Sequence, residues 1–251
     1  EKGIFLIEDV AQACGGSYKG KKLGSFGDMG AFSFNHYKII SSGEGGAIIT
    51  NNEDYYLNSV VEHHGGIFFE KEYATKVQNH CRIGSNYRLS EISGAVLLSQ
   101  LKRIETFISG LRSEKKFLTD EISEFSNDKY RIPPISDKQG DCSRGFFLRF
   151  SDSNLANKFL SLTQSQGIDS FSTFSRGHTA SCWQHLLGSA KIFKKIDKDT
   201  FLQKNFIFNP ETLTNTDKIL KTTVGINTKH DRNKVELNAL AKSVRSIIEG
   251  L

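Results

Sequence analysis

The sequence contains no apolar run that approaches roughly 18 residues, the length that a membrane-spanning helix needs. The opening stretch, EKGIFLIEDV, also lacks the basic segment and the small-residue cleavage site of a signal peptide. We therefore expect no membrane association and a cytoplasmic location. Because the chain begins with Glu rather than Met and reaches an apolar run almost at once, we also expect it to be a piece of something longer.

Cysteine is sparse and scattered. The four cysteines form no CxxC pair, so the sequence indicates neither a zinc ribbon nor a disulfide framework. We expect reduced thiols, as is usual in the cytoplasm, and no metal site. These cysteines are Cys14, Cys81, Cys142 and Cys182.

Charge of one sign is not concentrated anywhere. The 33 basic and 28 acidic residues give a net charge of +5 that is spread along the chain, which offers little support for nucleic-acid binding. The hydrophobic content of 37% over 251 residues is ordinary for a globular protein and allows a substantial core.

Proline is also rare, and the pair Pro133 and Pro134 marks the predicted domain boundary. We predict a large α/β domain in residues 1–130, with a mixed sheet that is incomplete here, and a small α+β domain in residues 131–251. Runs of alternating or continuous apolar residues predict strands, and helical spacing predicts helices. The predicted strands are 4–9, 31–35, 46–50, 146–150 and 168–174, and the predicted helices are 54–64, 90 to about 125, 154–166 and 235–248.

One lysine lies in an unusual turn. In AFSFNHYKIISSGEGGAIIT an apolar strand pattern stops, a polar run surrounds Lys38, and a second apolar run follows the glycine-rich GEGG. An isolated lysine is usually a solvated surface cation. A glycine-rich turn, however, allows close approach of a ligand, and a partly desolvated lysine can lose its proton and attack a carbonyl.

An acidic residue offers a partner for such a lysine. Asp9 ends the first predicted strand, where structural roles as a helix N-cap or a surface acid also stay open. In enzymes that use pyridoxal phosphate (PLP), a lysine forms a Schiff base while an acidic residue keeps the pyridine nitrogen protonated. The sequence supplies one residue for each role.

The segment IEDVAQACGGSYKGKKLGSFGDMGAFSFNHYKIISSGEGGAIITNN resembles the central region of the DegT/StrS type of sugar aminotransferase, within the fold type I PLP superfamily. A second block, GSNYRLSEISGAVLLSQLKRIETF, is similar to the stretch that follows in that family. Both blocks occur in the expected order. The overall layout is also similar to the branch that aminates an oxidised octulosonate sugar (8-amino-Kdo synthesis).

The resemblance implies roles for five residues. Lys38 is expected to hold the cofactor covalently and to move a proton, and Asp9 to pair with the pyridinium nitrogen. Gln12 is expected beside the ring and its phenolic oxygen, and Ser33 at the phosphate. Asn86 is expected to reach the phosphate of a neighbouring subunit, which implies a homodimer with a shared active site. The simpler readings stay open: Ser33 as an ordinary strand residue and Asn86 as a turn residue.

The resemblance also implies the reaction: transfer of an amino group, from an amino-acid donor such as glutamate, to a keto sugar in amino-sugar or cell-surface polysaccharide synthesis, including lipopolysaccharide. His36 and Tyr37 are expected to line the pocket. His178 and His185 are expected either at the substrate cleft or in a loop around a buried Trp183.

Two other functions remain open. One subfamily of similar proteins has histidine in place of the lysine and dehydrates the sugar, which Lys38 argues against. A noncatalytic PLP- or sugar-binding fragment or regulator is the other. Family members begin with a further segment that carries a phosphate-binding turn, and the sequence contains no equivalent of it. We therefore expect weak PLP binding by this chain alone and an exposed apolar sheet edge.

Overall fold

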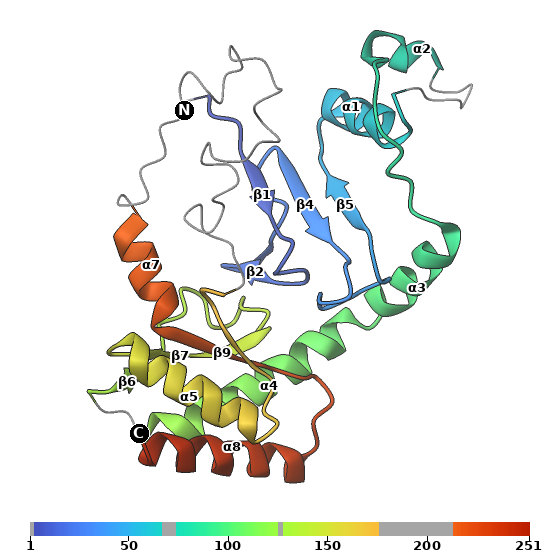
Figure 1. The fold of residues 1–251 in the computed structure, drawn as a ribbon. Coiled ribbons are helices and arrows are strands. Elements are labelled where there is room, and N and C mark those ends of the chain that lie inside the picture. The colour runs from blue at the N-terminus through green and yellow to red at the C-terminus, as the bar shows by residue number, and fades with distance from the viewer. Residues whose placement is uncertain (1–2, 67–73, 125–127, 176–212) are drawn as a thin grey trace. The chain divides into compact units, whose positions relative to one another are not determined.

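A computed structural model describes residues 3–66, 74–124, 128–175 and 213–251 (Figure 1). These residues form two compact units, each assembled from several chain segments. Unit 1 consists of Glu1–Glu114, Ile135–Arg144 and Lys229–Asp231, and unit 2 of Lys115–Pro134, Gly145–Thr228 and Arg232–Leu251. The division into sequence domains 1–130 and 131–251 stays a prediction.

Unit 1 contains a mixed three-stranded sheet in the order β1-β4-β5 (Figure 1). Strand β1 is Ile7–Asp9, β4 is Met29–Ser33 and β5 is Gly46–Ile49. β1 runs parallel to β4, and β5 runs antiparallel to it. A small hairpin of β2 (Ser17–Tyr18) and β3 (Lys21–Lys22) lies in the connection between β1 and β4, where the glycine-rich sequence predicts only loop.

The first strand is not buried as its apolar pattern predicts. Ile4 is 77% exposed and Ile7 is 57% exposed. Within the described ranges, β1 pairs with a strand on one side only, so it lies at an edge of the sheet. An apolar run can mark a strand without revealing which neighbours cover it.

Glu8 joins β1 to the loop before β4. Its carboxylate accepts backbone N–H groups from Gly24, Phe26 and Gly27 at 2.7, 2.5 and 2.8 Å. Burial by itself raises the pKa of Glu8, but these three donors and the charge of Lys21 outweigh it and hold the pKa below its usual value.

Helix α1 (Glu53–His63) begins at Asn52, whose side chain accepts the Tyr55 N–H, close to the predicted helix 54–64. A short helix α2 (Ala74–Val77) and a 3-10 turn η1 (Gln78–His80) pack against it, and α1 and α2 share a small cluster of apolar residues. The buried members of this cluster are Leu57, Val61 and Val77.

The predicted long helix is two helices. α3 is Glu91–Leu101, capped by the Ser90 side chain, and α4 is Ile104–Ser123. Between them Arg103 donates to the Gln100 carbonyl at 2.9 Å, a tighter i to i+3 bond that interrupts the α-helical ladder. The periodicity also misjudged burial along α3, because Ile92 is 80% exposed whereas Ile108 of α4 is fully buried.

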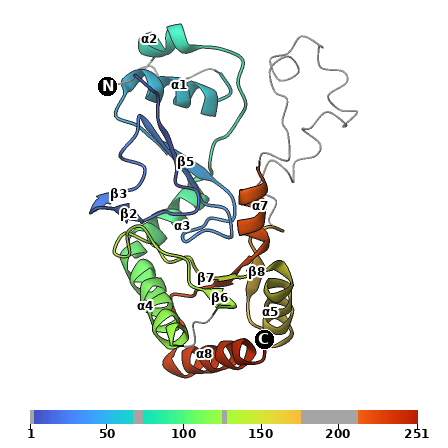
Figure 2. The same ribbon diagram turned by 90° about the vertical axis from the view of Figure 1, so that its left-hand side faces the viewer.

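Unit 2 is an α+β unit with an antiparallel sheet in the order β6-β7-β9-β8. Helices α5 and α8 lie beside these strands (Figure 2), and their apolar faces share one core with the C-terminal half of α4. Phe146, Phe159 and Val244 are fully buried in it. The elements are β6 (Tyr130–Arg131), β7 (Gly145–Phe150), α5 (Ser153–Ser165), β8 (Ser170–Ser172), α7 (Thr214–Lys221), β9 (Thr223–Asn227) and α8 (Lys234–Glu249).

Local signals fix the ends of these helices. Asp152 accepts two N–H groups at the start of α5, and Gly167 follows the helix with φ +75°. Asn233 and Glu236 form a capping box at the start of α8. The predicted helices 154–166 and 235–248 therefore agree closely with α5 and α8.

Candidate functional site

The turn that carries Lys38 extends the β4–β5 pairing beyond the strands. Phe34 donates to Gly45 and His36 donates to Gly43, both at 2.8 Å, so the hairpin remains hydrogen-bonded up to the turn itself. The Lys38 N–H closes the turn on the Asn35 carbonyl at 2.9 Å. Gly43 and Gly45 have φ of +89° and +139°, conformations that L side chains rarely adopt, which explains the glycines.

Helix α3 holds the far side of this turn. The Gln100 side chain accepts the Ser41 N–H at 2.9 Å and donates to the Ser41 carbonyl at 2.6 Å. On the near side, the Asn35 side chain accepts the Tyr37 N–H at 3.0 Å. The backbone around Lys38 is therefore restrained from both directions.

Lys38 and Gln12 line the same narrow hollow, which has no room for a water molecule in this structure and is also lined by Ala11, Cys14, Ile39 and Arg144. The sequence predicts both Lys38 and Gln12 as cofactor residues, and the structure brings them together. Burial raises the pKa of Cys14, and the neighbouring Cys142 thiol raises it further. Cys14 is therefore a protonated, unreactive thiol in the wall of the hollow rather than a nucleophile.

Asp9 and Ser33 share one face of the three-stranded sheet. Asp9 is in register with Ala31 of β4, and Ser33 lies two residues further along that strand. Since side chains alternate along a strand, Asp9, Ala31 and Ser33 project from the same face, at the end where β1 and β4 finish. One oxygen of the Asp9 carboxylate accepts the Ala11 N–H at 3.0 Å.

Asn86 lies in a different segment and does not line the hollow. It forms an isolated bridge with His64, and its side-chain oxygen accepts both the N–H and the Nε–H of Arg88, at 3.1 and 3.2 Å. The expected role of Asn86 at the phosphate of a neighbouring subunit stays a prediction.

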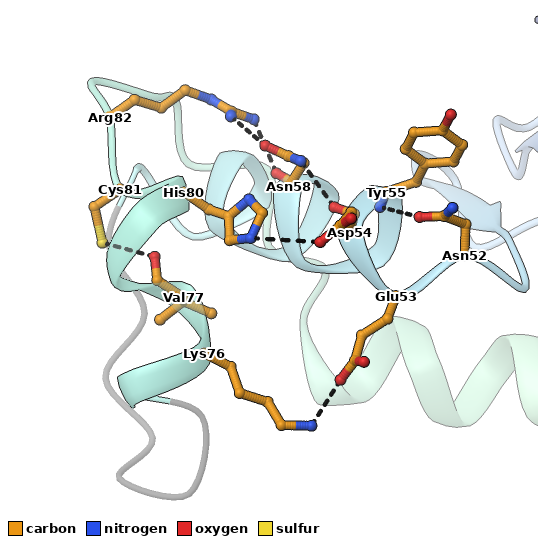
Figure 3. Close-up of polar contacts among 10 residues, drawn as sticks. All are labelled: Asn52, Glu53, Asp54, Tyr55, Asn58, Lys76, Val77, His80, Cys81 and Arg82. Carbon is orange, nitrogen blue, oxygen red and sulfur yellow. Dashed lines mark hydrogen bonds and ion pairs between the residues drawn. The ribbon is translucent and has the colours of Figure 1, made fainter.

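The segment that leads to Asn86 is anchored on α1 (Figure 3). Arg82 donates to the side chain and the carbonyl of Asn58 at 2.7 and 2.9 Å, and to the Glu62 carboxylate at 3.0 Å. Figure 3 also shows Lys76 paired with Glu53 at 2.6 Å. These contacts fix the start of the segment that carries Asn86.

Two of the predicted substrate residues lie beside each other but outside the hollow. The rings of His36 and Tyr37 are 3.8 Å apart, and Tyr37 is 63% exposed. Neither residue is among those that line the hollow with Lys38, and their expected role at the substrate pocket stays a prediction. The other two predicted residues, His178 and His185, lie outside the described residues, as does Trp183.

Sequence reasoning missed Arg144. One of its guanidinium nitrogens, Nη2, donates to the Tyr37 carbonyl at 2.9 Å, across a separation of 107 residues, and its side chain lines the hollow. No local pattern marks this arginine, because it simply precedes a predicted strand.

Within the ranges that the structure describes, no group of three or more His, Cys, Asp or Glu side chains could hold a metal ion. Nor is any helix in those ranges long and apolar enough to cross a membrane.

Comparison with known proteins begins with a family model. Residues 1–230 match the DegT/DnrJ/EryC1/StrS aminotransferase family. Over 111 residues the chain is 40% identical to the GDP-perosamine synthase of Escherichia coli O157:H7, which covers 44% of this chain and 29% of that protein.

Two solved structures have a similar fold. PseC of Helicobacter pylori, an aminotransferase involved in the biosynthesis of pseudoaminic acid, matches with a TM-score of 0.75 and 20% identity over 98% of this chain and 60% of its own. The GDP-4-keto-6-deoxy-D-mannose-3-dehydratase of E. coli, with bound hydrated PLP, matches with a TM-score of 0.72 and 21% identity over 97% of this chain and 61% of its own.

The chain thus has the fold type I architecture that these solved structures share. More narrowly, the chain belongs to the DegT/DnrJ/EryC1/StrS aminotransferase family. It spans 29% of the perosamine synthase and 60% of PseC, so it corresponds to part of each relative.

Proposed function

We propose that the protein containing this chain transfers an amino group from an amino-acid donor, glutamate, to a keto sugar, with PLP as its cofactor. The observation that carries the proposal is the shared hollow of Lys38 and Gln12. Family membership and the amino-sugar relatives support it.

The chemistry of the described residues fits PLP. Lys38, with its amine, and Gln12, with its amide, both line one narrow hollow. A carboxylate, Asp9, and a hydroxyl, Ser33, project from one sheet face where β1 and β4 end. This set offers an amine for the aldehyde, an anion for the ring nitrogen and a donor for the phosphate.

When bound, PLP supplies an electron sink at the carbon from which the amino group leaves. The chain's own residues supply the rest. Lys38 anchors the cofactor and then moves a proton as a base at its Nζ atom. The Asp9 carboxylate holds the proton on the ring nitrogen, Gln12 orients the ring and Ser33 donates to the phosphate.

The remaining partners follow from the same proposal. Asn86 would serve a second copy of the chain, which makes a homodimer with a shared site the working assembly. Its separation from the Lys38 hollow within one chain is consistent with that role. We place the enzyme in the cytoplasm, in the synthesis of amino sugars for cell-surface polysaccharide such as lipopolysaccharide. The 8-amino-Kdo branch stays a prediction.

Dehydration of the sugar is the competing reaction, because a dehydratase has a similar fold and the fold alone does not distinguish dehydration from amino transfer. Lys38 favours amino transfer, since a lysine provides both the covalent anchor and the proton carrier. A noncatalytic binding role remains the other alternative.

A half-reaction tests the proposal without knowledge of the sugar. The complete protein, loaded with PLP, is mixed with glutamate or glutamine, and the keto acid released is measured per site. We expect about one equivalent from the wild type, none from Lys38→Ala, and wild-type release from Lys242→Ala, an exposed lysine of α8. Release by Lys38→Ala at the wild-type level would reject the assignment, and no release by the wild type would favour the noncatalytic role.

A further inference from the structure

The short segment before β7 is held in a strained conformation. Ser143 has φ +59° although it is not glycine, and it is buried. Its N–H and its hydroxyl both bond to the Asp141 carboxylate, at 3.1 and 3.2 Å. A left-handed serine costs on the order of 1 kcal/mol or more, so the surrounding structure must enforce it.

Two further contacts fix this segment from outside. Arg112 of α4 donates to the Asp141 carbonyl at 2.8 Å. The Cys142 thiol is 3.7 Å from the Gln12 carbonyl, in the loop that lines the Lys38 hollow. Both contacts hold the two residues that directly precede Ser143, and Arg144 follows directly after it.

Arg144 connects this rigid segment to the lysine turn. Its Nη2 atom donates to the carbonyl of Tyr37 at 2.9 Å, and that carbonyl belongs to the peptide group that leads into Lys38. The side chain is half-buried and lines the same hollow as Lys38 and Gln12. A hydrogen bond from a charged donor to a carbonyl is among the stronger restraints on a turn.

We propose that Arg144 is a positioning residue for Lys38. By holding the Tyr37 carbonyl, it fixes the peptide plane from which Lys38 extends, so that the amine enters the hollow beside Gln12. The strained backbone at Ser143 sets the direction of the Arg144 side chain, and the restrained turn sets the direction of the Lys38 side chain. This inference rests on the proposed role of Lys38 as the residue that reacts with PLP.

The test compares three variants of the complete protein with the wild type. Arg144→Ala removes the hydrogen bond, and Arg144→Lys keeps the charge and one donor. Arg149→Ala, within the strand β7 that begins directly after Arg144, is the matched control. Circular dichroism and thermal unfolding confirm that each variant folds.

Three measurements are made on each protein. Hydrogen exchange of the peptide that spans Lys38, in protein without cofactor, reports how firmly the turn is held. The rate at which PLP reacts with Lys38 is followed by borohydride reduction and mass mapping of the modified lysine, together with the pH midpoint of the absorbance band of the lysine-bound cofactor.

For Arg144→Ala we expect about tenfold faster exchange and about tenfold slower modification of Lys38, the effect of losing one charge-assisted hydrogen bond at a partly exposed site. The absorbance midpoint should also shift. Arg144→Lys should recover part of each effect, and Arg149→Ala should match the wild type.

The remaining outcomes would overturn the inference in distinguishable ways. Unchanged exchange in Arg144→Ala would show that the arginine does not hold the turn. Faster exchange with unchanged modification and absorbance would show a purely structural role. If PLP does not modify Lys38 even in the wild type, the proposed function itself fails, and the positioning role fails with it.

Discussion

Replacement of Glu8 by glutamine should destabilise the protein well beyond an ordinary surface change. The carboxylate accepts three backbone N–H groups, from Gly24, Phe26 and Gly27. Glutamine keeps one acceptor oxygen but turns an amide NH₂ toward the remaining donors. At least one bond to a charged group is then lost and the others weaken. Each such bond contributes about 1.5 kcal/mol or more, and solvent recovers part, so we expect a loss of about 2 kcal/mol.

The pH dependence of the unfolding free energy tests the role of the Glu8 carboxylate more specifically than the loss at a single pH. The pKa of Glu8 is lowered in the folded protein, so the folded state favours the ionised carboxylate. Its contribution to stability is therefore fully present above the ordinary value of 4.5 and is lost as the pH falls through the lowered pKa. Glu8→Gln cannot titrate, so the difference in stability between wild type and variant should narrow as the pH falls through this range.

Urea unfolding at several pH values measures both effects. Glu124→Gln, at an exposed glutamate just after α4, is the control and should change the free energy of unfolding by no more than about 0.5 kcal/mol. If Glu8→Gln and Glu124→Gln give equal unfolding energies and parallel pH curves, the three donor contacts do not stabilise the loop as argued.

Two further predictions concern single groups elsewhere. Tyr130→Phe removes a buried hydroxyl that donates to the Ile122 carbonyl at 3.1 Å, and should cost about 1 kcal/mol in urea unfolding. Burial raises the pKa of Tyr130 from 10.0 to about 12. The contribution of this residue to stability is therefore fully present below pH 10 and is lost as the pH rises through about 12. A titration of the tyrosines in which every midpoint lies near 10 would contradict this. Gly66→Ala would place a Cβ 1.6 Å from the Arg82 carbonyl oxygen at φ +95°, whereas Gly65→Ala meets open space at φ +86°. We expect Gly66→Ala to cost about 2 kcal/mol more than Gly65→Ala, because only the first adds a clash to the backbone strain, and equal losses would refute the clash.

The elements with local end signals could be predicted well from the sequence. Asp152 and Gly167 bracket α5, and the Asn233 capping box starts α8, because caps satisfy backbone groups within a few residues. The strands on either side of the lysine turn could also be predicted from local sequence, because each has an apolar pattern bounded by glycine.

The burial of individual side chains and the continuity of the long helix could not be predicted from local sequence. Ile92 and Ile7 have the pattern of core residues yet are largely exposed, since burial depends on neighbours that the pattern does not specify. The interruption at Arg103 has no proline or glycine to mark it. Strand β9 was missed although it is a central strand of its sheet, because TTVGIN is short and contains a glycine.

The sequence by itself determined the family and the lysine turn, because these depend on residue types at fixed short spacings, and it predicts Lys38, Asp9, Gln12 and Ser33 as site residues. The roles of these residues remain predictions. Tertiary structure alone decided that Lys38 and Gln12 share a hollow and that Arg144 holds the Tyr37 carbonyl. Those contacts join segments separated by up to 107 residues, and only the packing of the folded chain sets such distances.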